Sequence, residues 1–214
     1  MIKNEKTSEL KALRQQAGYT LIELAISIAI ISVLVVSAMF GVQKIIDNNN
    51  VNAVSQHVTL ANANIQKASK MLADKSFPMN TNNAANLGIW PDNITTKVNG
   101  LVTQVTNPFG GNYFTATNNL DVGAVTAGNG YYIMITNVPD RVCASVAGMF
   151  GASAWQIVVN DETVPVGMPV GPVSGPTLTT DVKQAGTDRI NVANLNARCG
   201  STAPRKTVHL YFPL

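Results

Sequence analysis

The chain is poor in the residues that build catalytic and metal sites. Its 214 residues include only two cysteines and two histidines, and 13% are charged. The cysteines have no CxxC spacing and the histidines lie far apart, so no zinc, redox or histidine-based catalytic motif is present. The sequence also has no phosphate-binding loop and no GxSxG motif. We therefore expect a protein that is not an enzyme and that holds no metal or cofactor.

Charge and aromatic residues are sparse as well. The formal net charge is +3, and aromatic residues make up 6% of the chain. We find no basic stripe with interleaved aromatics, which argues against nucleic-acid binding. The abundant neutral polar residues favour an exported protein, or one whose surfaces pack against copies of itself.

A long apolar segment follows a basic leader near the N-terminus. From Tyr19 to Val42 the only charged residue is Glu23. As a helix this segment would be about 36 Å long, enough to span a bilayer. The basic residues before it predict a cytoplasmic leader and an external C-terminal domain. An uncleaved signal anchor would explain these features, but it would not explain Gly18 followed by Glu23.

The sequence AGYTLIEL, residues 17–24, resembles the processing site of type IV pilin precursors. In that family a membrane peptidase cuts after glycine and usually N-methylates the new first residue, and the fifth mature residue is glutamate. The resemblance implies cleavage between Gly18 and Tyr19, methylation of Tyr19, and an assembly salt bridge from Glu23 to the Tyr19 amine of the preceding subunit. A wrong register would leave a buried charge unpaired. A first residue other than Phe and the long mature chain indicate the type IVb class.

The resemblance implies a structural filament subunit, a major pilin. Its partners would be copies of itself in a homopolymer, the prepilin peptidase, an assembly platform with its ATPase, and the inner membrane before assembly. The mature subunit would lie in an extracellular pilus that can contact a host or recipient cell. Adherence, aggregation, conjugation and DNA uptake all remain open as tasks of that pilus.

Two alternatives from other functional classes share parts of this pattern. A minor pilin or type II secretion pseudopilin has the same N-terminus but acts at a tip or as a piston. The mature length and the late, widely spaced cysteines favour a major pilin over these. A membrane-anchored binding module would never polymerise, and it would have no use for Glu23.

The sequence predicts four segments: a leader of residues 1–18, a transmembrane and filament-core helix over 19–42, an amphipathic helix over 43–75, and a globular head over 76–214. The amphipathic helix has apolar residues at alternating steps of three and four, which predicts one buried face. These residues are Val51, Val54, Val58, Ala61, Ile65, Ala68 and Leu72. Pro78 is expected to end the helix. Phe40 stands where many pilins have a proline, so any bend must come from Gly41 or from the asparagines at 48–50.

The head is expected to be α+β, with an antiparallel sheet packed on the long N-terminal helix. Strands are predicted at Lys97–Thr106, Tyr131–Thr136, Trp155–Val159 and Lys206–Phe212. A helix is expected to open at Asp140. Turns or loops are expected at residues 107–111, 161–162 and 165–176.

Cys143 and Cys199 are the two cysteines of the chain. An exported domain with two cysteines usually pairs them, although two free buried thiols are the alternative. Closing this loop would stabilise the head by about 4 kcal/mol in the chain-entropy account. In pilins a late disulfide bounds a variable edge of the head, so the resemblance implies that residues 143–199 form this edge.

Overall fold

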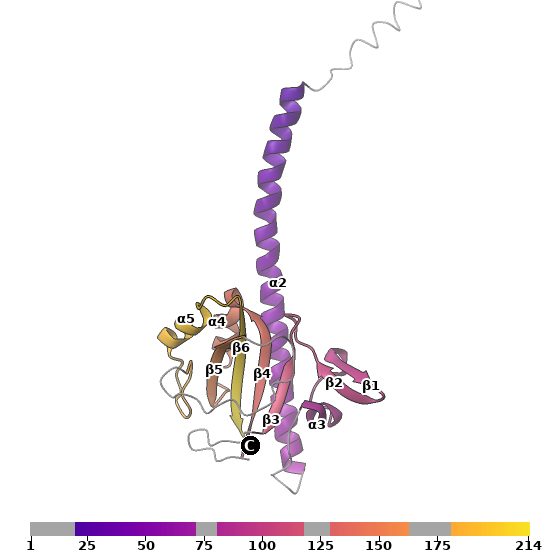
Figure 1. The fold of residues 1–214 in the computed structure, drawn as a ribbon, viewed down its shortest axis with the longest axis vertical. Coiled ribbons are helices and arrows are strands. Elements are labelled where there is room, and N and C mark those ends of the chain that lie inside the picture. The colour runs from indigo at the N-terminus through magenta and orange to yellow at the C-terminus, as the bar shows by residue number, and fades with distance from the viewer. Residues whose placement is uncertain (1–19, 72–80, 118–128, 163–180) are drawn as a thin grey trace, which may run out of the picture. The chain divides into compact units, whose positions relative to one another are not determined.

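The computed structural model describes residues 20–71, 81–117, 129–162 and 181–214 (Figure 1). The chain divides into two compact units, Met1–Ile46 and Asp47–Leu214, and each is considered by itself. The predicted leader 1–18, Tyr19, Leu72, Pro78 and the loop at 165–176 lie outside the described residues.

Helix α2 (Leu21–Met71) crosses the unit boundary without a break. It remains α-helical through Gly41 and through the asparagines at 48–50, so neither position interrupts it. Every residue from 20 to 46 is exposed, and this part of α2 is long and apolar enough to cross a membrane. The described helical parts of the segments predicted at 19–42 and 43–75, Leu21–Met71, thus belong to one helix.

The second half of α2 buries one face. The buried residues are Val51, Val54, Val58, Ala61 and Ile65. They follow the predicted steps of three and four, so the prediction of an amphipathic helix is confirmed over this range. Ala68, the next residue of the pattern, is half-buried.

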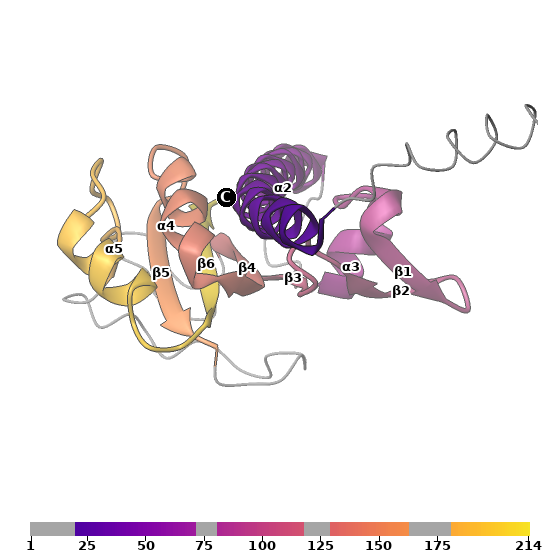
Figure 2. The same cartoon turned by 90° about the horizontal axis from the view of Figure 1, so that it is seen from above.

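The head contains a four-stranded antiparallel sheet. Its strands are β3 (Tyr113–Thr117), β4 (Gly130–Pro139), β5 (Gln156–Asp161) and β6 (Arg205–Pro213), in the order β3-β4-β6-β5. α2 and helix α4 (Asp140–Met149) lie on the same side of this sheet (Figure 2). Alternate residues such as Ile133, Leu210 and Ile157 point to that side and form the main core with the α2 stripe.

Most predicted elements of the head are confirmed. The runs predicted at Tyr131–Thr136 and Lys206–Phe212 lie within β4 and β6, the run predicted at Trp155–Val159 lies in β5 except for Trp155, and the helix opens at Asp140. Their β-branched and aromatic residues suit strands that are buried on one or both faces. The structure therefore has the expected α+β class.

The single strand predicted at Lys97–Thr106 is wrong, because this segment is a hairpin. β1 (Thr95–Val98) pairs with β2 (Leu101–Val105) around Asn99 and Gly100, which have φ of 52° and 80°. An Asn-Gly pair adopts these left-handed angles readily and forms the two-residue turn that joins antiparallel strands. Four further elements lacked a prediction: α3 (Thr81–Asn86), the 3₁₀ helix η2 (Asp92–Ile94), β3 and α5 (Val192–Cys199).

The turn predicted at residues 107–111 is present and is organised by a buried asparagine. Asn107 Oδ1 accepts hydrogen bonds from the backbone N–H of Phe109 (2.9 Å) and Gly111 (3.1 Å), and Asn107 Nδ2 donates to the Thr136 carbonyl (2.8 Å). A Cβ atom at Gly111 would lie 2.5 Å from that carbonyl oxygen. Only glycine therefore lets the turn approach β4 this closely.

Candidate functional site

Glu23 lies in the first turn of α2 and closes a capping box with Thr20. The Glu23 carboxylate accepts from the Thr20 backbone N–H (3.2 Å) and from the Thr20 hydroxyl (3.0 Å), and the Glu23 N–H donates to the same hydroxyl at 3.3 Å. This reciprocal arrangement satisfies two of the N–H groups that a helix start leaves without partners. The carboxylate also complements the positive end of the helix dipole.

Thr20 is a site residue that our sequence analysis missed. The signal was present, because Thr20-Leu21-Ile22-Glu23 has the T-x-x-E spacing of a capping box. The box shows that Glu23 has a local partner within its own chain, in addition to any amine that a neighbour supplies. Both residues are exposed, so the carboxylate is open to a further partner. Gly18 and Tyr19 lie outside the described residues, and their roles stay predictions.

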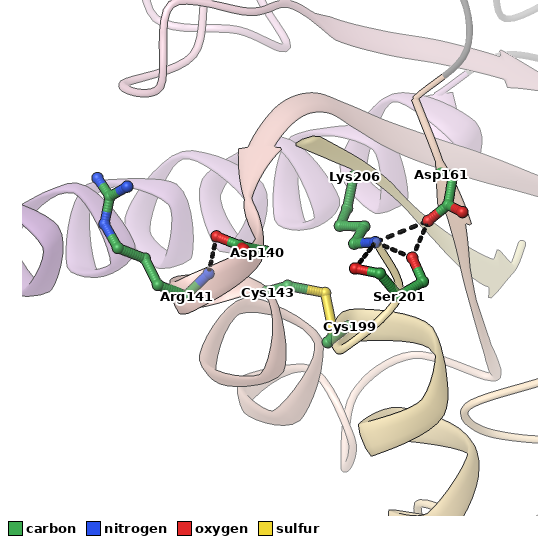
Figure 3. The surroundings of a disulfide bond; sticks show 7 residues. All are labelled: Asp140, Arg141, Cys143, Asp161, Cys199, Ser201 and Lys206. Carbon is green, nitrogen blue, oxygen red and sulfur yellow. Dashed lines mark hydrogen bonds and ion pairs between the residues drawn. A yellow bond between two sulfur atoms is a disulfide. The ribbon is translucent and has the colours of Figure 1, made fainter. Parts of the chain in front are cut away.

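Cys143 and Cys199 form a disulfide bond, as predicted (Figure 3). Cys143 lies on α4 and Cys199 is the last residue of α5, and their Cα atoms are 5.6 Å apart. Both side chains are buried. The bond therefore fastens α5 to the helix that covers the sheet.

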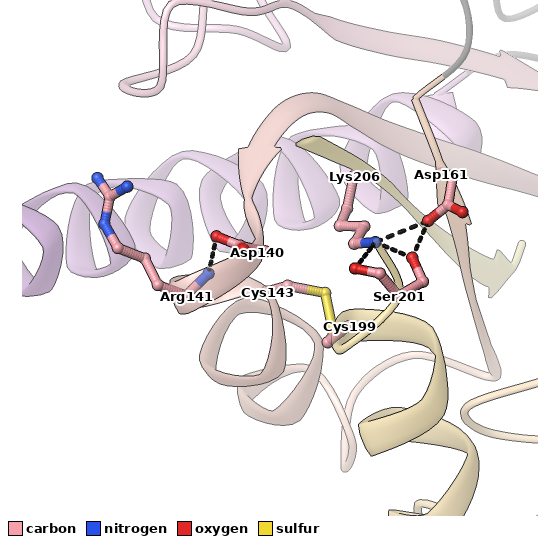
Figure 4. A network of polar contacts seen from close by, with 7 residues as sticks. All are labelled: Asp140, Arg141, Cys143, Asp161, Cys199, Ser201 and Lys206. Carbon is pink, nitrogen blue, oxygen red and sulfur yellow. Dashed lines mark hydrogen bonds and ion pairs between the residues drawn. A yellow bond between two sulfur atoms is a disulfide. The ribbon is translucent and has the colours of Figure 1, made fainter. Parts of the chain in front are cut away.

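An ion pair between a buried lysine and a partly exposed aspartate lies beside the disulfide (Figure 4). The ammonium of Lys206, whose side chain is fully buried, donates to Asp161 Oδ1 at 2.7 Å. The Ser201 hydroxyl accepts from Lys206 and donates to Asp161. The Lys206 hydrogen bond lowers the pKa of Asp161. Asp161 is the last residue of β5, where it pairs with Lys206 of β6. The turn predicted at residues 161–162 is wrong, because the strand continues through Asp161.

We expect Asp161→Ala to destabilise the head by about 3 kcal/mol, because it leaves a buried ammonium with no carboxylate. Adding Lys206→Met should restore most of this loss, since methionine matches the aliphatic stem without the charge. Urea unfolding of the mature chain in detergent, followed by tryptophan fluorescence, measures both variants. Equal stability of Asp161→Ala and wild type would show that the ion pair contributes nothing.

The second face of the sheet holds an uncharged histidine. His209 is buried beside Tyr132, with ring centroids 6.4 Å apart, and Met134 and Val158 are its register partners on the flanking strands. Among the described residues, none donates to or accepts from His209 Nδ1. Burial lowers the pKa of His209 from 6.5 to about 4, because the apolar surroundings disfavour the charged ring.

The head should therefore lose stability as pH falls from 6.5 to 4. In this window unfolded His209 binds a proton that the folded chain does not bind, so unfolding becomes more favourable by up to about 3 kcal/mol. Urea unfolding at pH 7 and pH 4.5 measures this loss of stability. His209→Leu should reduce the loss without abolishing it, because carboxylates that titrate in the same range contribute the rest. Identical pH dependence in the two chains would contradict a neutral buried His209.

Comparison with known proteins identifies the family. The family described as PilS N terminal matches residues 47–209, which is most of the chain. The chain belongs to this family. The prokaryotic N-terminal methylation motif matches residues 13–39, which include Gly18, Tyr19 and Glu23. No curated protein sequence matches the chain.

A solved type IV pilin structure shares the fold of this chain. TcpA, a type IV pilin from Vibrio cholerae El Tor biotype, is 15% identical with a TM-score of 0.52, and the match covers 77% of this chain and 99% of TcpA. The type IVb pilin from Salmonella typhi is 17% identical with a TM-score of 0.48, covering 74% of this chain and 97% of that one.

Together with the motif and the family, the fold shared with TcpA confirms the expectation of a type IV pilin precursor, and the type IVb class stays a prediction. The precursor is an inner-membrane protein whose motif marks it for prepilin peptidase and for polymerisation into a surface pilus. Its family and fold are those of a structural protein. Within the described residues, no group of three histidine, cysteine or acidic side chains is placed to hold a metal ion.

Proposed function

We propose that this chain is the major structural subunit of a type IVb pilus. The observation that supports this most directly is Glu23, a carboxylate at the start of an exposed apolar helix within the matched methylation motif. A charge at this place is costly in lipid unless a partner compensates it. A neighbouring subunit that begins at Tyr19 would supply that partner as its α-amino group.

Processing in this proposal removes residues 1–18 and methylates Tyr19. Residues 19–42 then form the membrane segment and later the filament core, residues 43–75 carry the face that packs on the head, and residues 76–214 form the head, with residues 143–199 as its disulfide-bounded edge. An assembly platform driven by a cytoplasmic ATPase extracts the helix from the inner membrane. The exposed apolar residues of α2 would exchange lipid contacts for contacts with neighbouring helices.

The Glu23 salt bridge would set the axial register of the filament. In the dry interior of a helix bundle, only one register brings a carboxylate next to the Tyr19 amine, and every other register leaves two unpaired charges. The finished filament would present heads to host or recipient cells, which is the setting for adherence, aggregation or conjugation.

Mass spectrometry of filaments sheared from the cell surface tests this proposal. We expect an abundant chain that begins at Tyr19, carries one methyl group and is two hydrogens lighter because of the disulfide. A trace amount of this chain beside another dominant subunit would indicate a minor pilin. A chain that begins at Met1 and remains in the inner membrane would contradict the filament role.

A further inference from the structure

Arg141 on α4 binds Asp47 on α2 through two hydrogen bonds. Arg141 Nε donates to Asp47 Oδ2 at 2.6 Å, and a terminal guanidinium nitrogen donates to Asp47 Oδ1 at 3.0 Å. The Asp47 side chain is only 13% exposed, whereas that of Arg141 is 60% exposed. This fork geometry is stronger and more directional than a single contact between charged side chains.

The ion pair is located where α2 has little else to hold it. Asp47 is the first residue of the head unit, and the buried stripe of α2 begins only at Val51. Between them stand three asparagines, of which Asn48 and Asn49 are exposed. Asparagine is a weak helix former, so the intrinsic propensity of these residues contributes little to the stability of this helical turn.

The α4 end of the ion pair has a firm base. Cys143, two residues after Arg141, is tied to α5 by the disulfide, and the Asp140 N–H donates to the Pro204 carbonyl at 3.3 Å. Val142, which lies between Arg141 and Cys143 in the sequence, is buried in the core. Figure 3 shows Arg141 and the disulfide leaving the same first turn of α4. Little backbone freedom is therefore lost when the guanidinium binds Asp47.

We propose that the Asp47–Arg141 ion pair is a clamp that positions the first turn of the packed part of α2. With the clamp formed, helical order in the head unit begins at Asp47. Without it, the asparagine turn opens and order begins at Val51. In a pilus, the clamp would fix the residue of α2 at which packing on the head begins. This consequence rests on the proposed function.

Hydrogen exchange of the mature chain in detergent micelles tests the clamp. We expect Arg141→Gln to accelerate exchange of the amides of residues 48–54 about fivefold, while amides of residues 58–65 and the thermal midpoint stay unchanged. Arg141→Lys, which keeps the charge but loses the fork, should give an intermediate rate. Lys97→Gln is the control, since it breaks an exposed ion pair with Asp92 that lies outside α2 and should leave α2 unaffected.

A double-mutant cycle separates the interaction between Asp47 and Arg141 from the effect of each residue alone. Asp47→Asn alone should match Arg141→Gln, and the double variant should also exchange about fivefold faster, because the same contact is already lost. Two effects that multiply would show that the residues act independently, and unchanged exchange at 48–54 would likewise overturn the clamp.

The filament yield provides the functional readout. Arg141→Gln should lower the amount of sheared filament while the amount of cleaved chain in the membrane stays constant. A filament yield of Arg141→Gln equal to that of the wild type would overturn the proposed role of the clamp in assembly. If the wild-type chain is itself absent from filaments, the proposed function fails, whereas the exchange result still decides whether the clamp exists.

Discussion

Glu23→Gln is expected to abolish filaments while the chain is still inserted into the membrane and cleaved. Glutamine keeps the length of the side chain and can close the same capping box with Thr20, but it carries no charge. The proposed salt bridge to the Tyr19 amine of the neighbour would therefore be lost with little change in the helix. Immunoblots of sheared surface material and of membranes measure assembly and cleavage separately.

Two further variants distinguish the charge from the helix cap. Glu23→Ala removes both, and it should fail to assemble like Glu23→Gln. Thr20→Ala removes the hydroxyl that bonds the carboxylate but leaves the charge, so it should lower helix stability by about 1 kcal/mol and still give filaments. Loss of filaments in Thr20→Ala alone would mean that the cap, rather than the charge, is what assembly requires.

Normal filaments from Glu23→Gln would contradict the register role of Glu23. The same result would remove the main argument for the proposed filament core, although it would leave the fold and the family unchanged. Accumulation of uncleaved Glu23→Gln precursor would instead assign Glu23 to recognition by the peptidase.

The elements that the sequence predicted well have strong periodicity of their own. The face of α2 from Val51 to Ile65 has a clear period of 3.6, and β4 and β6 contain continuous runs of apolar and β-branched residues that the structure buries on both faces. The helix opening at Asp140 also had a local signal, because Pro139 directly precedes the helix and Asp140 places an acidic residue in its first turn.

The elements that were missed depend on short signals or on tertiary contacts. The hairpin turn was readable from Asn99 and Gly100 alone, and the strand predicted over Lys97–Thr106 did not take this pair into account. α5 is only eight residues long, and its apolar residues Val192, Leu195 and Cys199 form too short a pattern to predict a helix. The pairing of Lys206 with Asp161, and of Arg141 with Asp47, depends on register and packing between distant segments, which no local pattern encodes.

Replacing both cysteines by serine is expected to destabilise the head by about 4 kcal/mol, because the open chain regains the entropy of a long loop. For a unit of this size the thermal midpoint should fall by about 10 °C. Circular dichroism of the mature chain in detergent, with and without a reductant, measures the effect. The wild type under reducing conditions should behave as the serine variant does, and surface piliation should fall with the stability of the head.

The loss should be concentrated at α5. This helix buries only Cys199, whereas α4 buries Val142, Val146 and Ala147 without help from the disulfide. Hydrogen exchange of the double serine variant should therefore show α5 exposed while α4 keeps its protection. The Lys206–Asp161 pair holds Ser201, just beyond α5, so β6 should stay paired. An unchanged thermal midpoint would show that the disulfide adds no stability, and equal loss of protection in both helices would show that α4 depends on it too.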